Sequence, residues 1–546
     1  MRMTGGEAVV RSLAAHGVDT VFGIPGTHNL AIYDALRHSG GIRHILARHE
    51  QGAAFMADGY ARASGKVGVC ICTTGPAALN TLASLGTAYS DSSPVLCIAS
   101  QIPAAGIGLD KGFLHECHDQ LGSFAPVTKW QARADTVEAI PETMREAFAQ
   151  MLTGRPRPTA VEIPCDTLDE SGEVTVPAAA TPQRLVPATE QIEQAVGLLG
   201  AAQRPVIWAG GGAVGSGASA EVLQLAERLQ APVFTTVLGK GILPEDHPLA
   251  AGNALLYPDA QAFLAECDLM LAIGTRFTEE ETDRWALQLP DCLIHIDIDQ
   301  EEIDRNYPST VGLVGDARAA LQQINARLGD LRRPPGGRAR EIADLRQQIW
   351  RSCQARAPEG VELVHTLRSA LPRETILVSD LTVAAYWCRR LIDVYEPNTF
   401  IYPWGFCTLG FGLPAAIGAK IARPERPVVV LCGDGGFMFN CQELAAAVQY
   451  DLPLVVLVFN DSAYGVLRPQ QEVRYGAAHE VDVVNPDFMS LAGAFGVDGR
   501  RVDSIEQLGP EVARAIEADR TTLIELPGSL PWPMVDPSAR MFEAAQ

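Results

Sequence analysis

Two acidic side chains at the ends of apolar runs give the clearest chemical signal in this chain of 546 residues. Asp434 follows the run Val428–Cys432, and Asp461 comes 27 positions later, just after the run Leu454–Phe459. Two carboxylates cannot face an anion without a cation between them, and Mg2+ or Ca2+ prefers such oxygen ligands. Glycines beside Asp434 let backbone N–H groups close on a phosphate (Gly433, Gly435 and Gly436). The pattern predicts a metal-bridged diphosphate site.

Two further sets of polar residues lie in the first third of the chain. Glu50 is expected to open a helix within the segment 42–65, where a glutamate is usually a surface charge that the helix dipole favours. The segment KGFLHECHDQ, residues 111–120, reads as a polar loop. His115 in this loop could donate a proton or orient a carboxylate. A metal site there is disfavoured because nothing else in the sequence supplies further ligands or groups that would orient them. A solvated surface loop is the alternative.

The elements that must position these residues predict an α/β fold. Short β-branched runs alternate with helical patterns, which indicates parallel strands joined by crossover helices. Two stretches rich in Pro, Gly, Ala or Thr read as linkers, Ser171–Pro187 and Gly329–Arg340. We therefore expect three doubly wound domains with parallel sheets, covering residues 1–175, 185–330 and 345–530. Ligands in such sheets bind at the carboxyl ends of strands, where both aspartates fall.

Composition narrows the class of protein. A net charge of −22 disfavours nucleic acid and anionic membranes as partners. No apolar run reaches the length of a membrane span, and the first ten residues lack the apolar core of a signal peptide. The 12 cysteines form no CxxC pair, and several lie in apolar runs, so we expect reduced thiols and a cytoplasmic protein.

The spacing of GDG and the later Asn-Asp pair resembles the thiamine diphosphate motif of the pyruvate decarboxylase and acetolactate synthase superfamily. The resemblance implies two cofactors, thiamine diphosphate and Mg2+. It also implies that Asp434, Asp461 and the main-chain oxygen of Ala463 hold the metal. Members of that family carry Asn where this chain has Asp461. A carboxylate still suits Mg2+, so we expect the metal to be retained.

Two other segments resemble the family's catalytic parts. RHEQGAAFMADGYARASG is similar to its glutamate segment, which implies that Glu50 hydrogen-bonds N1′ of the cofactor and favours the imino tautomer that deprotonates C2. WGFCTLGFGLPAAIGA is similar to the stretch under the thiazolium, which implies a wedging role for Leu409 and an acceptor role for the Cys407 carbonyl. The resemblance adds a cofactor-contacting set: Pro25, Thr74, Gly75, Asn80, Thr382, Tyr464, Gly465 and Val466. The expected catalytic residues are Glu50, His115 and Gln120.

The implied reaction is loss of CO2 from a 2-oxo acid, leaving an enamine that is protonated to an aldehyde or passed to a carbonyl acceptor. The lid region departs from both main branches, because Leu467 replaces the glutamate of pyruvate decarboxylases and Gln470 the tryptophan of acetolactate synthases. His115 likewise replaces a glutamine of the synthases. Several motifs look most like 2-ketoarginine (5-guanidino-2-oxopentanoate) decarboxylases. An acetolactate synthase-like carboligase is the alternative, and a catalytically silent cofactor-binding regulator is disfavoured by the retained Glu50, Asp434 and Leu409.

The same resemblance bears on a third cofactor and on assembly. The glycine-rich stretch 204–217 is a weak dinucleotide signal, since the full GxGxxG spacing is not clearly met. Acetolactate synthases carry FAD in the central domain and many relatives carry nothing there, so FAD is open but not expected. The family places thiamine diphosphate between two subunits. A homodimer is therefore the expected minimum, and a homotetramer the expected assembly.

Overall fold

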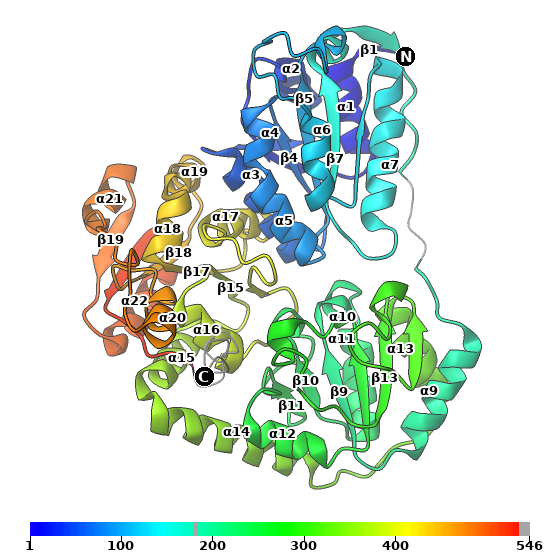
Figure 1. The fold of residues 1–546 in the computed structure, drawn as a ribbon, viewed down its shortest axis with the longest axis vertical. Helices are drawn as coiled ribbons and strands as arrows, with labels where there is room; N and C mark the ends of the chain where they lie inside the picture. Colours follow the sequence, from blue (N-terminus) through cyan, green and yellow to red (C-terminus); the bar gives the residue numbers. More distant parts are fainter. Residues whose placement is uncertain (180–183, 534–546) are drawn as a thin grey trace.

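Figure 1 shows the computed structural model of the chain, which describes residues 1–179 and 184–533. Three six-stranded sheets, each with all strands parallel, are flanked by helices, which confirms the predicted class of three doubly wound α/β domains. Four residues of the first predicted linker, 180–183, lie outside the described residues. Within the described part, no helix combines the length and apolarity needed to span a bilayer.

The first sheet has the strand order β3-β2-β4-β5-β7-β6. Its strands are β2 (Thr20–Gly23), β3 (Arg43–Leu46), β4 (Gly68–Cys72), β5 (Val95–Gln101), β6 (Trp130–Arg133) and β7 (Thr159–Pro164). Its helices are α1 (Gly5–Ala15), α2 (Leu30–Ser39), α3 (Glu50–Ser64), α4 (Pro76–Asn80), α5 (Leu82–Ser90), α6 (Gln120–Phe124), α7 (Ile140–Leu152) and α8 (Cys165–Asp169). A short antiparallel pair, β1 (Arg2–Thr4) and β8 (Ser171–Glu173), ties the start of this domain to its end.

The central sheet has the strand order β11-β10-β9-β12-β13-β14. Its strands are β9 (Pro205–Ala209), β10 (Val233–Thr235), β11 (Ala250–Gly252), β12 (Leu269–Ile273), β13 (Cys292–Asp297) and β14 (Val311–Val314). Its helices are α9 (Thr189–Ala201), α10 (Gly211–Gly215), α11 (Ser219–Leu229), α12 (Pro258–Ala265) and α13 (Ala317–Arg327).

The third sheet has the strand order β16-β15-β17-β18-β20-β19. Its strands are β15 (Ile376–Ser379), β16 (Phe400–Ile401), β17 (Val428–Gly433), β18 (Val455–Asn460), β19 (Asp498–Arg501) and β20 (Thr522–Pro527). Its helices are α14 (Arg338–Arg356), α15 (Pro358–Ala370), α16 (Val383–Leu391), α17 (Gly412–Ala422), α18 (Asp434–Asn440), α19 (Leu444–Gln449), α20 (Leu467–Tyr475), α21 (Phe488–Phe495) and α22 (Ile505–Glu517).

Each sheet reverses its winding between two adjacent strands. The reversal falls between β2 and β4, between β9 and β12, and between β15 and β17. The crevice outside the carboxyl ends of the strands at such a reversal is where doubly wound sheets bind ligands. The residues predicted to contact the cofactor follow β2 and β4 in the first sheet and β15 and β17 in the third. The winding therefore creates a ligand crevice in each of these two sheets.

Helices α3 and α17 pack directly on each other and join the first domain to the third (Figure 1). Bare backbone makes this approach feasible: a Cβ on Gly59 would lie 2.1 Å from the Ala415 carbonyl oxygen, and one on Gly418 would lie 1.9 Å from that of Met56. No side chain larger than hydrogen fits at either position without a shift of the main chain. The two helices are thus held at backbone contact distance.

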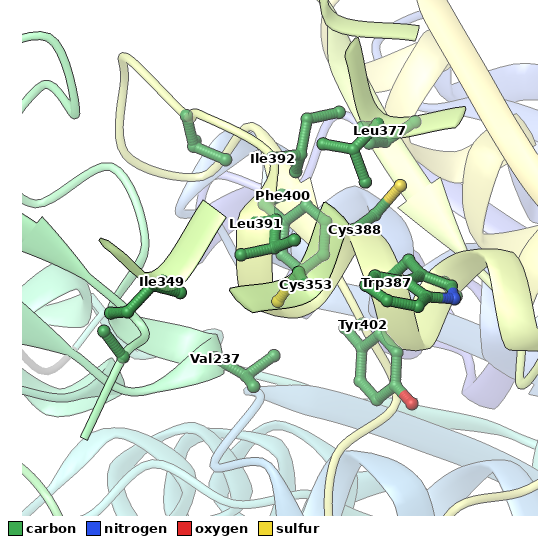
Figure 2. Close-up of a cluster of buried hydrophobic side chains, with 14 of the residues drawn as sticks. Val237, Ile349, Cys353, Leu377, Trp387, Cys388, Leu391, Ile392, Phe400 and Tyr402 are labelled. Atoms are coloured by element: carbon green, nitrogen blue, oxygen red, sulfur yellow. The ribbon is translucent and has the colours of Figure 1, made fainter. Parts of the chain in front are cut away.

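A cluster of buried apolar side chains joins the third domain to the central domain. Figure 2 shows the buried Trp387 and Cys388 of α16 beside Cys353 of α14, with Val237 of the central domain in the same cluster. The Trp387 indole N–H donates to the Pro531 carbonyl at 2.7 Å, so its one polar atom is satisfied. Helix α14 lies between the central and third domains in sequence and packs into a core that both share. The domain boundaries predicted at residues 330 and 345 therefore stay predictions.

The backbone contact between α3 and α17 yields a stability test. We expect Gly418→Ala to lower the melting temperature, because its methyl group would press on the Met56 carbonyl; overpacking of this kind costs about 1–3 kcal/mol. Gly197→Ala in α9 is the matched control, since a Cβ at that position would meet nothing within 4 Å and alanine favours helix. Differential scanning fluorimetry of both variants makes the comparison. Equal melting temperatures would contradict the packing argument.

Candidate active site

Asp434 and Asp461 meet at the carboxyl edge of the third sheet. Asp434 is the first residue of α18 and is 2% exposed, while Asp461 follows the end of β18. Burial, and then the neighbouring charge of Asp434, raises the pKa of Asp461 to about 6. Asn485 donates to Asp434 Oδ2 at 2.6 Å and to the Asn460 side-chain oxygen at 3.0 Å, which fixes the pair of strand ends. Two carboxylates that repel each other in a crevice form a site that favours a cation.

The main chain beside these acids is closely packed, and glycines leave it without side chains at positions 435 and 465. A Cβ on Gly435 would lie 2.9 Å from the Tyr464 ring, and one on Gly465 would lie 2.1 Å from Asp461 Oδ2. The Ala463 carbonyl accepts no hydrogen bond from the described residues, so it is a third oxygen open to a metal. In the part of the chain that the structure describes, no three His, Cys, Asp or Glu side chains gather as a closed metal site. Water or a bound molecule such as a diphosphate would complete the coordination of a metal there.

Asp380 supports the same crevice and was missed by the sequence reasoning. It follows β15, accepts from the Leu381 and Gly412 N–H groups at 2.8 and 2.9 Å, and lies 2.8 Å from where a Cβ on Gly436 would be. Burial raises its pKa to about 6. Asp380 thus anchors the start of α17 to the end of β15. Thr382 comes two residues later as the N-cap residue of α16, facing Gly433 across the reversal of the sheet.

The loop carrying Cys407 and Leu409 is fixed by the first domain of the same chain. The Trp404 N–H donates to Asp91 Oδ2 at 2.9 Å, and Thr87 donates to the Thr408 hydroxyl at 3.0 Å. The Cys407 backbone has φ of 54°, a left-handed conformation that is uncommon for a residue with a side chain. This conformation persists because contacts on both sides determine it.

Glu50 stands at the first position of α3, as the sequence predicts. His49 caps the helix through its ring nitrogen, and the Asn80 side-chain amide donates to Glu50 Oε2 at 3.0 Å. Behind it, the buried Glu443 accepts from the Arg48 and His49 N–H groups at 3.0–3.1 Å. Burial raises the pKa of Glu443 to about 7. Sequence reasoning missed Glu443, although a glutamate inside an apolar helical stretch was a usable signal.

Two predicted catalytic residues, His115 in the loop before α6 and Gln120 at the start of that helix, make different contacts. Gln120 is 1% exposed; its amide donates to Ser100 O and Glu162, and its oxygen accepts from the Gly75 N–H at 2.6 Å. It holds the Thr74–Gly75 turn and has no free donor for a substrate. His115 lies beside that turn with a buried Nδ1 that has no partner among the described residues. Pro25 lies exposed on the loop after β2.

Within one chain the start of α3 contacts the third domain at Asn440 and Glu443, beside the helix that begins at Asp434. Glu50 contacts Asn80 and lies near Glu443, whereas the aspartate pair is surrounded by Asn485, Asn460 and the lid. In the described residues, no hydrogen bond or ion pair links the acid on α3 to the aspartates on the third sheet.

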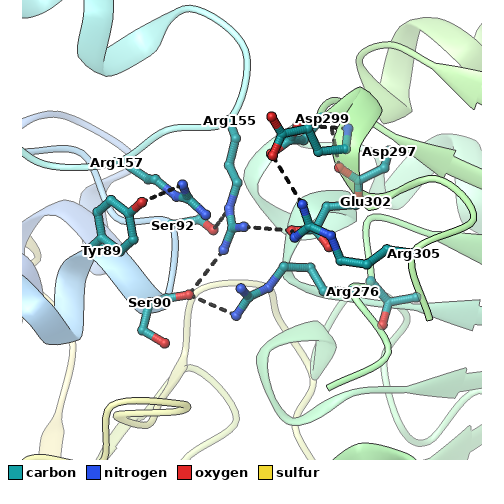
Figure 3. Close-up of polar contacts among 12 residues, drawn as sticks. Tyr89, Ser90, Ser92, Arg155, Arg157, Arg276, Asp297, Asp299, Glu302 and Arg305 are labelled. Atoms are coloured by element: carbon teal, nitrogen blue, oxygen red, sulfur yellow. Dashed lines mark hydrogen bonds and ion pairs between the residues drawn. The ribbon is translucent and has the colours of Figure 1, made fainter. Parts of the chain in front are cut away.

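A cleft of about 710 Å³ opens at the carboxyl ends of the central strands β9, β12 and β13. Figure 3 shows its border with the first domain, where Arg155 donates to Glu302 at 3.0 Å and shares the Ser90 carbonyl with Arg276. Packing explains one glycine of this turn, since a Cβ on Gly210 would lie 2.3 Å from the Gly274 carbonyl oxygen, whereas a Cβ on Gly215 would meet nothing within 4 Å. FAD was left open but not expected from the sequence, and that expectation stays a prediction.

Comparison with known proteins identifies the class. Models of the thiamine pyrophosphate enzymes match the chain three times: the N-terminal TPP binding domain over residues 3–123, the central domain over 192–324 and the C-terminal TPP binding domain over 380–526. The chain belongs to the thiamine pyrophosphate enzymes. Its cofactor is thiamine diphosphate, which this family binds with Mg2+. The bare glycines, the paired carboxylates and the open Ala463 carbonyl fit that pair of ligands.

Among individual proteins, the chain is 42% identical over 530 residues to a probable 2-ketoarginine decarboxylase of Pseudomonas aeruginosa, covering 96% of this chain and 94% of the relative. It is 37% identical over 580 residues to a probable acetolactate synthase large subunit of Methanocaldococcus jannaschii, covering 100% and 95%. It is 35% identical over 555 residues to the acetolactate synthase isozyme 2 large subunit of Escherichia coli, covering 99% of each. These similarities confirm the superfamily predicted from the motifs.

The buried Glu443 gives a pH test. A carboxyl whose pKa rises from 4.5 to about 7 on folding favours the folded state at low pH, and this contribution is lost as pH rises through 7. We therefore expect the wild-type melting temperature to fall between about pH 5 and about pH 8, and Glu443→Gln to show a flatter profile. The exposed Glu362→Gln is the control. Identical slopes in wild type and Glu443→Gln would refute the assignment.

Proposed function

We propose that this chain is a thiamine diphosphate- and Mg2+-dependent decarboxylase of a 2-oxo acid with a guanidinium tail, as in 2-ketoarginine. The observation that carries the proposal is the 42% identity, over nearly the full length of both chains, to a probable 2-ketoarginine decarboxylase. The replacements at His115, Leu467 and Gln470 also support it, because they remove residues that the main branches use.

The third domain would hold the diphosphate end of the cofactor. Asp434, Asp461 and the Ala463 carbonyl would bind Mg2+, with N–H groups of the adjacent glycines on the phosphates. Around them would lie the remaining predicted contacts: Thr382, Gly433, Gly435, Gly436, Tyr464, Gly465 and Val466. When bound, the cofactor supplies a thiazolium carbon that accepts the electron pair released with CO2.

The first domain would hold the pyrimidine end. Glu50 would share a hydrogen bond with N1′, oriented by the Asn80 amide that already contacts it. Pro25, Thr74 and Gly75 would line the same side, while the Cys407 carbonyl and Leu409 would face the ring from the third domain. His115 would orient the substrate carboxylate. For Gln120 its burial favours a positioning role over contact with substrate.

The proposed assembly rests on the family resemblance, which implies that the cofactor lies between two subunits. A second copy of the chain would bring its α3 acid to the aspartate pair of the first, so a homodimer is the minimum active unit and a homotetramer the expected form. All 12 cysteines are free thiols, which suits the reducing cytoplasm. The same arrangement could serve an acetolactate synthase-like carboligase, which the 35–37% identities to synthase large subunits favour.

A substrate panel separates the two reactions. Purified protein with thiamine diphosphate and Mg2+ is offered 2-ketoarginine, pyruvate and 2-oxobutanoate, and CO2 and products are measured by mass spectrometry. We expect CO2 and 4-guanidinobutanal from 2-ketoarginine, and loss of turnover after metal chelation that Mg2+ restores. Acetolactate from pyruvate as the main product would favour the carboligase. No turnover with any 2-oxo acid would overturn both.

Glu50 is tested by removing only its ability to exchange a proton. We expect Glu50→Gln to keep thiamine diphosphate binding but to lose turnover by about 10²–10⁴-fold, because an amide preserves the contact with N1′ but cannot ionise. Calorimetry measures binding, and CO2 release measures turnover. Glu190→Gln, at an exposed first turn of α9, is the matched control. Wild-type turnover in Glu50→Gln would remove Glu50 from the mechanism.

A further inference from the structure

Two imidazoles meet where the winding of the first sheet reverses, and only one of them was noticed in the sequence. His28 lies on the loop after β2, and His115 lies on the loop before α6. Their ring centroids are 5.4 Å apart with the planes at 69°, an edge-to-face contact. His28 Nδ1 lies 2.9 Å from the Thr74 hydroxyl, which bridges the ends of β2 and β4. The pair therefore faces the same crevice as the Thr74–Gly75 turn.

The Thr74 contact leaves one nitrogen of His28 available. The Thr74 hydroxyl is itself 3.2 Å from the Ser100 hydroxyl, and both residues are fully buried. This short chain of hydroxyl groups fixes the ring through Nδ1. In the described residues Nε2 of His28 makes no hydrogen bond, and the side chain is only half-buried. A held ring with one open nitrogen is the arrangement that proton transfer to a ligand requires.

His115 is held just as firmly. Its backbone φ of 64° is left-handed, and its carbonyl oxygen packs so closely on Gly75 that a Cβ there would lie 2.2 Å away. Gln120 binds the Gly75 N–H from the far end of the same loop. The two histidines and the turn between them thus form one rigid wall.

The surroundings of His28 weaken its hold on a proton. Burial, and then the charge of His115, lowers the pKa of His28. The loop after β2 and the Thr73–Gly75 turn carry no other titratable side chain, and Glu116 on the His115 loop is engaged by the Gly112 and Phe113 N–H groups. His28 therefore releases its proton more readily than an exposed histidine.

We infer that His28 donates, through Nε2, the proton that replaces CO2 on the substrate carbon, and so directs the enzyme to aldehyde. The inference rests on the proposed decarboxylation. The bond between the carbonyl carbon and the carboxylate breaks, CO2 leaves, and the electron pair left behind forms a C–H bond with the Nε2 proton. Neutral His28 then regains a proton from water. In total one 2-oxo acid anion and one proton become one aldehyde and one CO2.

A carbonyl acceptor competes with this proton for the same electron pair. If His28 is the donor, removing its proton slows aldehyde formation while ligation to the acceptor continues. A residue that merely supports the wall would slow both outcomes together. The ratio of ligation product to aldehyde therefore reports on proton donation rather than on folding.

The test measures that ratio in His28→Asn, which can keep a hydrogen bond to Thr74 but cannot ionise. With the substrate that wild type decarboxylates and an excess of aldehyde acceptor, we expect aldehyde formation to fall by about 10²-fold and the ratio to rise about tenfold or more. His118→Asn, an exposed histidine on the same loop as His115, is the matched control. Equal loss of both products, or an unchanged rate of aldehyde formation, would overturn the role of His28.

A second measurement keeps the inference open to refutation if His28→Asn does not fold. Hydrogen–deuterium exchange at the imidazole C2 position, followed by mass spectrometry of the His28 peptide, gives the titration midpoint of His28 in the holoenzyme. We expect that midpoint to rise in His115→Asn, because a positive neighbour is lost. An unchanged midpoint would overturn the pairing even in an active enzyme. A wild type that releases no CO2 would instead overturn the proposed function.

Discussion

The backbone contact between α3 and α17 is the constraint on which the geometry of the chain depends. α3 begins at Glu50, and α17 begins three residues after Leu409, so the helices that meet at Gly59 and Gly418 carry at their starts the predicted pieces of the two cofactor walls. At contact distance between main chains, a shift of one helix moves the other. Within each chain the acid at the start of α3 and the loop that carries Leu409 are therefore held in a fixed relation to each other.

Three carboxyl groups that are costly to ionise lie in the part of the chain that α3 and α17 hold together. Burial raises the pKa of Asp461, Asp380 and Glu443, so each ionised carboxylate opposes folding near neutral pH. Backbone N–H groups offset part of this for Asp380 and Glu443. The negative charge of Asp434 also disfavours ionisation of Asp461. A divalent cation bound to both carboxylates would offset this repulsion. A metal ion bound there would stabilise the fold as well as hold the cofactor, since ligands that bind only the folded state shift the folding equilibrium.

How much could be predicted from the sequence depended on whether the signal was local. The strand that ends just before Asp434, the helix beginning at Glu50 and the parallel sheets all follow from patterns within about 15 residues, and the structure has them. Asn485 binds Asp434 from 51 positions away, and His28 meets Thr74 from 46 positions away, so neither is visible before the chain is folded. Gln120 shows the opposite difficulty. Its position in a polar loop indicated contact with substrate, while long-range contacts bury it.

The replacements that separate this chain from the main branches of its family lie on loops at the rim of the crevice. Leu467 and Gln470 belong to α20, which contributes no buried side chain to the fold, and His115 lies on a loop that packs against the Thr74–Gly75 turn and His28. Such positions can change without disturbing the sheets or the metal loop. The bond-breaking step depends on the deep, charged parts of the site, which a change at the rim leaves intact. The fate of the electron pair that follows depends on which proton or carbonyl reaches it first. On the proposed function, one scaffold would therefore give an aldehyde or a ligation product according to a few side chains on the loops around the crevice.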